Sequence, residues 1–461
     1  MVSLFIALLL CVRTSHAQQK QIDFSELEKT ISEEMQANST PGAAVAIIVG
    51  GQLVFAQAFG VSNVETRTPA TPGMLFRIAS NTKMLTAAAL VTLAEQGKLR
   101  LDEPVGTYVK GLSPKLSKIT VHQLLGHTSG MQDGASDFGS HDDAALGQTV
   151  RAWNDAYLFT EPGVIFSYSN LGYDLAGLTL EAVTGKPYAD AMNELLFKPL
   201  GMQSTTLRPT IAMTYPLSQG HKLGEDGRPV VVRPYSDKVE HWPSGGVFTS
   251  ILDYSRFVIA FMNQGKVDGQ QILLPGMIAK LSTPHVESPS GNQQWRARVG
   301  YGLNILDYRG VRVLQHGGNV VGFGSLLRMS PEHRFAVIIL ANRSGALLLK
   351  SFEKATELAV SLPPATKPPA KGSLPVSAEE MNRYAGIYVN SPDYLSVEIL
   401  KKDNSLFLRQ VGSSASSKII RIGENRFSAD GEEFVLIPGA NGTVVYLHIV
   451  GHAFKKAVAQ R

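Results

Sequence analysis

The sequence predicts an α+β fold in which an antiparallel sheet is flanked by helices, as in an α/β sandwich, and a small all-β barrel follows. Strand-like runs occur at residues 41–63 and again at 299–342. Between about 100 and 215 the chain is helical and rich in loops, which predicts an all-helical subdomain inserted between those runs. Residues 381–461 carry short strand-like runs separated by turn signals, a pattern typical of a small barrel or sandwich.

The N-terminal stretch "MVSLFIALLLCVRTSHA", residues 1–17, predicts a secretory signal peptide. Its apolar core, Leu4–Val12, is too short to span a bilayer. Ser15 and Ala17 fit the small-x-small cleavage pattern, so we expect a mature chain that starts at Gln18 and is secreted or periplasmic. The alternative is an uncleaved anchor or an ordinary buried helix, but the polar "QQKQ" that follows favours cleavage.

A large domain is expected over residues 18–361. It opens with a helix over 24–37, where the apolar positions have helical spacing, and continues with two short strands around a Gly-Gly turn. Further helices are expected over 80–97 and 246–264. The polar, glycine-bearing stretch 132–144 reads as a surface loop.

The second half of the chain divides at a proline-rich stretch. Strand-like runs within 299–342 are followed by a helix over 347–362, which closes the large domain. Five of the fourteen residues in 362–375 are proline, so we expect a stiff linker over 362–380. The small β-barrel domain then occupies 381–461.

Composition excludes several classes of partner and chemistry. Cys11 is the only cysteine and leaves with the signal peptide, which excludes disulfides and thiol catalysis in the mature chain. The net charge of +4 is small for 461 residues and no dense basic patch is present, so no nucleic acid partner is expected. No later segment is apolar enough for stable membrane insertion. No cofactor is implied, no spacing predicts a metal site, and "SHDD" at 140–143 reads as a solvated loop. The oligomeric state does not follow from the sequence.

The pattern S-x-x-K occurs twice, at Ser80–Lys83 and at Ser351–Lys354. A serine and a lysine three positions apart share a helix face, and the residues after Lys83 are almost wholly apolar. Partial burial would lower the pKa of Lys83, and a neutral amine beside a hydroxyl is a base beside a nucleophile. The alternative is an ordinary serine at a helix start followed by a lysine that reaches solvent. In the second copy, Lys354 reads as an ordinary surface position.

Two other stretches carry candidate site residues. "FSYSNLGYDLAG" places Tyr168 and Asn170 on either side of a serine, and nearby cations lower the pKa of a tyrosine. "QHGGNVVGFG" places His316 before two glycines, where a substrate can lie close to the backbone. The N–H of Asn319 can pair with that of Ser80 to hold an oxyanion. Taken singly, each stretch also fits an ordinary turn packed on a core.

The three motifs together, "SNTK" at 80–83, "YSN" at 168–170 and "HGG" at 316–318, resemble those of the penicillin-recognising serine hydrolases. The resemblance is greatest to the branch that holds class C β-lactamases, D-alanyl-D-alanine carboxypeptidases and related esterases. "ITVHQLLGHTSGM" (119–131) and "PSGGVFTSILDYSRF" (243–257) also match that branch. The likeness covers roughly residues 24–360 and implies a mixed antiparallel sheet with a helical insert. The C-terminal module resembles a lipocalin-like domain appended to some members.

The resemblance implies a catalytic role for three residues. Ser80 would be the acylated nucleophile, and Lys83 and Tyr168 would share the base and acid roles. His122 and His127, both in the stretch 119–131, would be buried hydrogen-bonding residues and not metal ligands.

The resemblance also implies a substrate-binding role for Asn170, His316, Gly318 and Asn319. Asn170 would orient the substrate amide and Lys83, while the N–H groups of Ser80 and Asn319 would form the oxyanion hole. Class C β-lactamases usually carry K-T-G where this chain has H-G-G, which replaces a fixed cation by an imidazole. The D-peptidase and esterase members use histidine there, so the change weakens a β-lactamase interpretation.

The sequence therefore predicts a secreted serine hydrolase that forms an acyl-enzyme on Ser80 and cleaves an amide or ester in a D-amino-acid peptide or carboxypeptidase-type substrate. The alternatives are a carboxylesterase or β-lactamase with the same residues, or a non-enzymatic penicillin-binding sensor. An α/β-hydrolase would need a G-x-S-x-G elbow, which is absent. The expected partner is a small peptide, ester or β-lactam, and cleft loops such as 132–144 and 215–245 are expected to set specificity.

Overall fold

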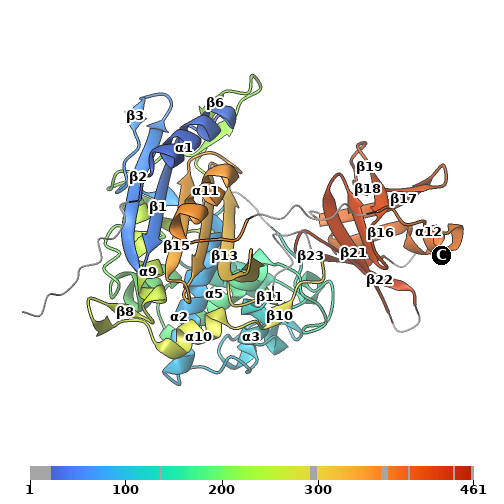
Figure 1. The fold of residues 1–461 in the computed structure, drawn as a ribbon. Helices are drawn as coiled ribbons and strands as arrows, with labels where there is room; N and C mark the ends of the chain where they lie inside the picture. Colours follow the sequence, from blue (N-terminus) through green and yellow to red (C-terminus); the bar gives the residue numbers. More distant parts are fainter. Residues whose placement is uncertain are drawn as a thin grey trace, which may run out of the picture.

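The computed structural model describes residues 22–134, 138–290, 298–364, 372–392, 395–439 and 442–457. The predicted signal peptide lies outside the described residues. The described chain forms a large antiparallel sheet with helices on both faces and a closed β-barrel beside it (Figure 1). This confirms the predicted fold class, including the all-helical subdomain and the C-terminal barrel.

The large sheet has nine strands, and its centre joins the two distant strand-rich regions of the sequence. β1 (Gly42–Val49) pairs with β15 (Phe335–Ala341), with Ala43 opposite Ala341. The strand order is β10 (Val286–Glu287), β11 (Arg298–Val299), β12 (Asn304–Tyr308), β13 (Val311–Val320), β14 (Phe323–Ser330), β15, β1, β2 (Gln52–Asn63) and β3 (Thr68–Pro69).

Alternate residues of β1 point to opposite faces of the sheet, and both faces are covered. One face packs on α1 (Ser25–Ala37) and α11 (Leu349–Ala359). The other packs on α2 (Thr82–Glu95), α9 (Ile251–Met262) and α10 (Pro275–Ser282), which join the helical subdomain in one core. That subdomain contains α3 (Val121–Leu125), α4 (Ala145–Ala152), α5 (Asn170–Thr184), α6 (Tyr188–Met192), α7 (Pro209–Ala212) and α8 (Trp242–Gly245).

Short strand pairs outside the large sheet fix the loops around these helices. They are β4 (Phe76–Arg77) with β7 (Phe248–Thr249), β5 (His221–Leu223) with β6 (Pro229–Val231), and β8 (Lys266–Val267) with β9 (Gln270–Gln271). The pair β4–β7 holds the chain immediately before Ser80 against the stretch that leads into α9. None of the helices that the structure describes is long and apolar enough to cross a membrane.

The barrel closes from eight consecutive strands and has its own core. Its strands are β16 (Gly386–Ser391), β17 (Leu395–Lys402), β18 (Ser405–Gln410), β19 (Ser417–Arg421), β20 (Arg426–Ala429), β21 (Glu432–Pro438), β22 (Val444–Ile449) and β23 (His452–Lys456). A helix, α12 (Ala378–Tyr384), precedes them and begins inside the predicted linker 362–380. The sequence analysis did not predict this helix, although the capping box formed by Ser377 and Glu380 is a signal of a helix start.

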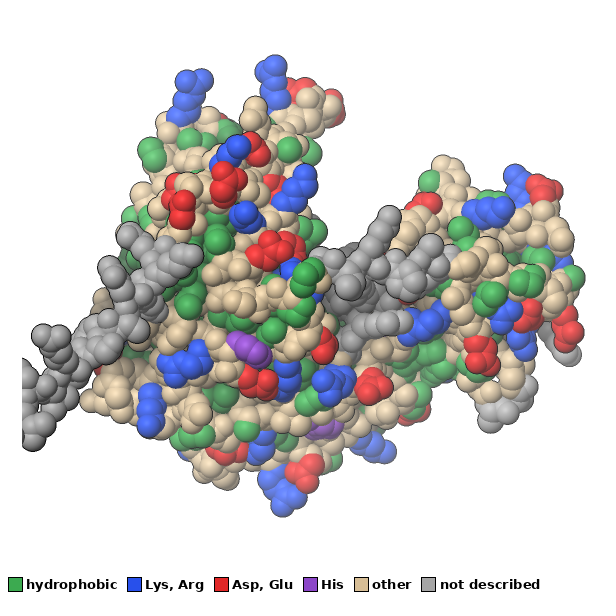
Figure 2. Space-filling view, viewed as in Figure 1, with side chains coloured by type: hydrophobic (Ala, Val, Ile, Leu, Met, Phe, Trp, Pro, Cys, Tyr) green, Lys and Arg blue, Asp and Glu red, His purple; other side chains and the backbone are tan. Residues whose placement is uncertain are grey.

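The barrel meets the helical subdomain along a packed seam. Ile165 of the subdomain is buried with Tyr446 and Ala453 of the barrel. The Nδ1 of His448 lies 2.6 Å from the Ser290 hydroxyl oxygen, beside the edge strand β10. Figure 2 shows positive and negative side chains intermixed over the visible face, without a continuous basic stripe.

The second S-x-x-K copy has a structural explanation. Ser351 lies in the first turn of α11 and is buried, and its hydroxyl donates to Glu34 Oε2 at 2.6 Å. The backbone N–H groups of Lys350 and Ser351 donate to the same carboxylate at 3.0 and 2.8 Å. Glu34 of α1 therefore caps the free donors at the start of α11.

We expect Glu34→Ala to lower the free energy of unfolding of the large domain by about 1–3 kcal/mol, because it leaves buried donors without acceptors. Glu33→Ala, an exposed position on the same helix, is the control and should change little. Thermal and urea unfolding of both variants would measure the difference. Equal midpoints for the two variants would contradict the assigned capping role.

Candidate active site

Ser80 lies in a tight 3-10 turn, Ala79–Asn81, between strand β4 and helix α2. Ala79 adopts a positive φ of 47°, which is costly for a residue with a side chain and persists only where the surroundings hold it. Asn81 is fully buried, and its side-chain amide donates to the Ser325 hydroxyl at 2.8 Å. The turn is thus anchored to β14, and it presents Ser80 at the start of α2.

Strand β13 passes directly beside this turn at Gly318. A Cβ on Gly318 would overlap the Ser325 hydroxyl and lie 2.5 Å from the carbonyl oxygen of Ile78. A Cβ on Gly317 would meet only ordinary contacts, the nearest at 3.5 Å on Leu326. The structure therefore gives Gly318 a packing role, since the absence of a side chain lets β13 approach the turn that carries Ser80.

Lys83 is fully buried in the first turn of α2. Its Nζ donates to Asn170 Oδ1 at 2.6 Å and to the Ser244 carbonyl oxygen at 2.7 Å, and it lies 3.3 Å from Ser80 Oγ. Burial lowers the pKa of Lys83 to about 7, although the nearby carboxylates of Asp133 and Asp174 oppose this shift. Both protonation states of the amine are therefore accessible near neutral pH.

Tyr168 lies two residues before α5, and its hydroxyl donates to Ser80 Oγ at 2.9 Å. Its ring stacks on His127 with centroids 4.5 Å apart, and the Lys83 ammonium nitrogen lies 4.8 Å from its centre. The expectation that a nearby cation lowers the pKa of Tyr168 is wrong. Burial raises that pKa well above its usual value, so the phenol keeps its proton at neutral pH.

Asn170 opens α5 and connects Lys83 to a carboxylate that the sequence did not reveal. Its backbone N–H donates to Asp133 Oδ1 at 2.7 Å, while its side-chain oxygen accepts from Lys83. Asp133 is only 5% exposed, although it lies in the stretch 132–144 predicted as a surface loop. No local pattern could mark it, because one of its partners, Asn170, is 37 residues away and another, His452, is 319 residues away.

His316 is buried on β13 with its Nδ1 facing the carbonyl oxygen of Gly317 at 2.6 Å. Burial and then the charge of Lys83 lower the pKa of His316 to about 4. At neutral pH the imidazole is uncharged, so it places a polar group and not a cation beside the site. Its ring centroid lies 6.3 Å from that of Tyr168.

Ser80, Asn170 and Asn319 line one cavity of about 300 Å³. The loop 215–245, predicted to set specificity, supplies much of the remaining wall, namely Ser236, Asp237, Lys238, His241, Ser244 and Gly245. The structure thus brings every predicted site residue together: Lys83 and Tyr168 contact Ser80, His316 lies by the Tyr168 ring, and Gly318 packs behind the turn.

A second carboxylate, Asp174, is fully buried one helical turn after Asn170. His241 of the cavity wall lies against it, with Nδ1 2.5 Å from Asp174 Oδ2. Neither residue was singled out in the sequence. Because Asp174, like Asp133, raises the pKa of Lys83, it contributes to the electrostatics of the site.

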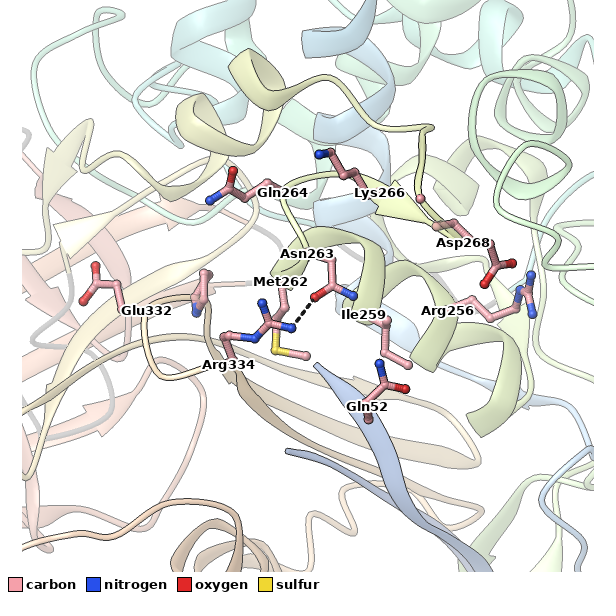
Figure 3. Close-up of a pocket in the computed structure, with 13 residues that line it drawn as sticks. Gln52, Arg256, Ile259, Met262, Asn263, Gln264, Lys266, Asp268, Glu332 and Arg334 are labelled. Atoms are coloured by element: carbon pink, nitrogen blue, oxygen red, sulfur yellow. Dashed lines mark hydrogen bonds between the residues drawn. The ribbon is translucent and has the colours of Figure 1, made fainter. Parts of the chain in front are cut away.

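Two other features of the described chain lie outside this site. A larger depression of about 870 Å³, shown in Figure 3, is lined by polar and apolar residues around the end of α9 and contains none of the predicted site residues. No group of histidine, aspartate, glutamate or cysteine side chains that could hold a metal ion occurs among the described residues. In the stretch 140–143, Asp143 pairs with Arg208 and His141 with Asp237.

A family model described as Beta-lactamase matches residues 27–360. Penicillin-binding protein 4 of Amycolatopsis lactamdurans is 30% identical over 345 residues, which cover 72% of this chain and 89% of that protein. Protein flp of Staphylococcus aureus strain MW2 is 28% identical over 352 residues, which cover 74% of this chain. The match spans 66% of the length of that relative.

Solved structures share the fold. The crystal structure of SurE superposes with a TM-score of 0.77 at 24% identity, covering 94% of this chain and 98% of SurE. The D-alanine carboxypeptidase AmpC from Burkholderia cenocepacia has a TM-score of 0.59 at 24% identity. That likeness covers 73% of this chain and 99% of the carboxypeptidase.

We expect Gly318→Ala to lower the thermal midpoint by several degrees, because its Cβ collides with backbone that cannot move without displacing the Ser80 turn. Gly317→Ala, one residue earlier on the same strand, is the matched control and should unfold near the wild-type temperature. Calorimetry of the two variants measures the contrast. Two equal midpoints would show that β13 does not constrain the turn.

Proposed function

Because the chain belongs to the beta-lactamase family of serine hydrolases, we propose that it hydrolyses an amide or ester through an acyl-enzyme formed on Ser80. The observation that carries this proposal is that Ser80 Oγ is contacted by both a buried amine and a half-buried phenol. The substrate class that we propose is a D-amino-acid peptide or carboxypeptidase-type peptide, as the sequence motifs imply. A second proposal, on the N-terminal sequence alone, is that the mature chain is secreted or periplasmic.

The contacts suggest which group is the base. A neutral Lys83 amine donates its N–H groups to Asn170 and the Ser244 carbonyl, and its lone pair then faces Ser80 at the longest of its three contacts. As Ser80 attacks the carbonyl carbon, its proton passes to Lys83. Tyr168 cannot take that role at neutral pH, since its own pKa is raised by burial.

Tyr168 is instead placed to deliver a proton to the leaving group. Its hydroxyl points at Ser80 Oγ, next to which the leaving nitrogen or oxygen departs from the tetrahedral intermediate. The proton that Lys83 took from Ser80 replaces the one that Tyr168 gives up, so the leaving group departs neutral and both residues are restored. Water then attacks the acyl-enzyme with the same groups in reverse roles and releases the acid.

The tetrahedral oxyanion needs donors on the side of the carbonyl opposite Lys83. The backbone N–H groups of Ser80 and Asn319 fit this role because both residues line the same cavity. The Asn319 side chain is directed elsewhere, as its Oδ1 accepts from the N–H of Gly345 at 2.8 Å. This fixes the end of β13 without occupying the cavity with the amide side chain.

A carboxylesterase is the second candidate, and the state of His316 favours it. A peptide cleaved at its C-terminal residue brings a carboxylate to the third motif, where this chain offers a neutral imidazole. An ester without that carboxylate needs no cation there. Lys238 is a cation of the cavity wall, but it lies near a carboxylate of the protein itself, with 3.7 Å between its Nζ and Glu240 Oε1.

We expect the mature chain to gain the mass of a penicillin on incubation, because the β-lactam is a cyclic amide that remains attached after ring opening. Ser80→Ala should gain nothing, and Ser351→Ala, which removes the serine of the other S-x-x-K copy, should still be acylated. Intact-mass spectrometry measures the adduct, and the absorbance of the lactam, followed in the same incubation, measures its loss. Lactam loss without an adduct would indicate fast deacylation and hence a β-lactamase.

If neither an adduct nor lactam loss occurs, short-chain esters and D-amino-acid peptides are tested next. Retained hydrolysis of all these substrates by Ser80→Ala would contradict the proposal.

The rate of acylation should rise with pH, because only the neutral Lys83 amine accepts the Ser80 proton. With its pKa at about 7, the neutral fraction grows from about a hundredth at pH 5 to about nine tenths at pH 8. We therefore expect the acylation rate constant to increase about a hundredfold over that range and then level off. Single-turnover kinetics against an ester probe measure this profile, and a rise that continues to about pH 10 would contradict the assignment of a buried Lys83 base.

A further inference from the structure

The segment that carries Tyr168 is held by the C-terminal barrel. The turn between β22 and β23 reaches into the helical subdomain, where the Gly451 carbonyl oxygen accepts from the Tyr168 backbone N–H at 2.8 Å. Directly beside it, the Ala453 N–H donates to the Ser167 hydroxyl at 3.1 Å. Two consecutive residues of the tyrosine segment are therefore bonded to a domain almost 300 residues further along the chain.

Asn390 of β16 extends this connection to the loop that carries Asp133. Its side-chain N–H groups donate to Ser167 Oγ at 3.2 Å and to the Ala453 carbonyl at 2.8 Å. Its side-chain oxygen accepts from the Asp133 backbone N–H at 2.8 Å. Asn390 is 1% exposed, so these bonds lie in a dry seam and not on the surface.

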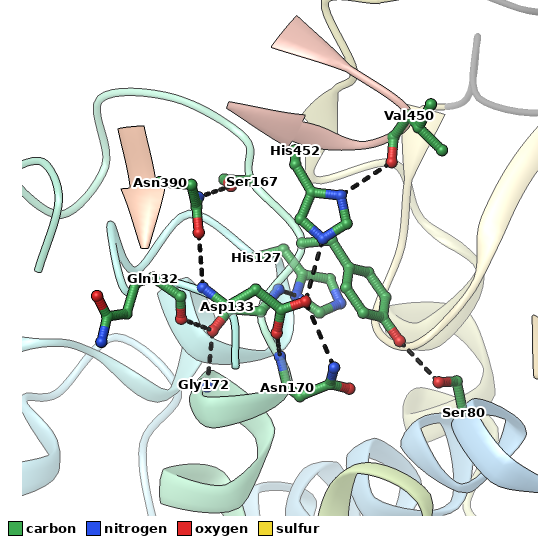
Figure 4. A network of polar contacts seen from close by, with 12 residues as sticks. Ser80, His127, Gln132, Asp133, Ser167, Asn170, Gly172, Asn390, Val450 and His452 are labelled. Atoms are coloured by element: carbon green, nitrogen blue, oxygen red, sulfur yellow. Dashed lines mark hydrogen bonds and ion pairs between the residues drawn. The ribbon is translucent and has the colours of Figure 1, made fainter. Parts of the chain in front are cut away.

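His452, the first residue of β23, contacts the Asp133 carboxylate itself. Its Nε2 lies 3.1 Å from Asp133 Oδ2, and its Nδ1 lies 3.1 Å from the Val450 carbonyl oxygen (Figure 4). Its ring also meets the edge of Tyr168, with centroids 5.8 Å apart. Both carboxylate oxygens thus have partners: Oδ1 accepts from the Asn170 backbone N–H, and Oδ2 contacts the barrel histidine and, at 3.5 Å, the Asn170 side-chain amide.

These contacts form a continuous chain from the barrel to the base. His452 holds Asp133, Asp133 holds the backbone of Asn170, and the Asn170 side chain holds the Lys83 amine at 2.6 Å. His452 itself is absent from the cavity wall. Any effect that it has on the reaction must therefore pass through Asp133 or the Tyr168 ring.

We propose that the C-terminal barrel completes the catalytic site, with His452 as a positioning residue that fixes Asp133 and, through Asn170, the Lys83 amine. This rests on the proposed acyl-enzyme function. A buried carboxylate that loses a donor pays a desolvation penalty and reorients to find another. Burial alone raises the pKa of Asp133, whereas His452 and the Asn170 N–H reverse this and hold that pKa below its usual value.

The test compares His452→Ala with His452→Gln in the full mature chain. Glutamine places an N–H donor near the position of the histidine Nε2, whereas alanine removes the donor. We expect His452→Ala to reduce kcat for an ester or peptide probe about ten- to a hundredfold with KM near the wild-type value, since a small displacement of the base slows chemistry and not binding. His452→Gln should recover most of the lost kcat.

Two controls separate positioning from a general loosening of the seam. Tyr446→Phe removes the 2.6 Å hydrogen bond between the Tyr446 and Thr160 hydroxyls, at the same seam but away from Asp133, and should keep the wild-type kcat. In an Asp133→Asn background, His452→Ala should have little additional effect, because its route to Lys83 is already broken. Thermal midpoints of all variants verify that the chain is folded.

The inference is overturned if His452→Ala retains the wild-type kcat, if glutamine restores no more activity than alanine, or if the His452 and Asp133 effects are additive. These outcomes differ from a failure of the proposed function, in which the wild-type chain itself shows neither acylation of Ser80 nor hydrolysis of any probe.

Discussion

The burial of one amine sets the requirements that the rest of the site meets. Lys83 has no exposed surface, and burying an ammonium group without acceptors is among the most costly events in folding. Its nitrogen is satisfied by Asn170 and Ser244, and these come from α5 and α8. The packed core of the helical subdomain therefore surrounds Lys83 and holds its amine beside Ser80.

The charge balance around the amine is as constrained as its position. Burial alone favours the neutral form strongly, while Asp133 and Asp174 favour the ammonium form, and the outcome is a pKa of about 7. Both carboxylates are themselves buried and each is held by a histidine, Asp133 by His452 and Asp174 by His241. The reactivity of one lysine therefore depends on groups drawn from α5, a long loop, the cavity wall and the barrel.

How much of this the sequence could predict depends on the range of each interaction. Ser80 and Lys83 are three residues apart, across the turn that opens α2, and Tyr168 and Asn170 share one short motif, so local spacing identified them. Asp133 was not identified as a site residue because its neighbours in sequence are polar and glycine-rich, which is also typical of a surface loop. Its burial is decided by Asn390 and His452, and no local pattern encodes a contact across more than 250 residues.

The same distinction between local and long-range interactions applies to the prediction of the fold. Strand-like runs, the helical spacing of apolar residues and the proline-rich stretch predicted the layers of the fold and the order of its domains. These features depend on the period of the apolar positions and on composition. Helix α12 was not predicted, because it is short and lies where the proline-rich stretch gives way to the barrel. The raised pKa of Tyr168 was also missed, because the depth of its burial depends on His127 and the barrel turn and not on its own motif.

The electrostatic balance around Lys83 also gives a reason for the barrel to pack against the loop that carries Asp133. If the seam between the domains were open to water, solvent could supply donors to Asp133, but its high dielectric would weaken the influence of that carboxylate on Lys83. A histidine and an asparagine from the barrel contact Asp133 in fixed directions, and Asp133 itself is only 5% exposed. The carboxylate then keeps its charge while buried, and the interaction that opposes the desolvation of Lys83 retains its strength. A domain that contributes no residue to the cavity wall can in this way influence the charge of the Lys83 amine beside Ser80.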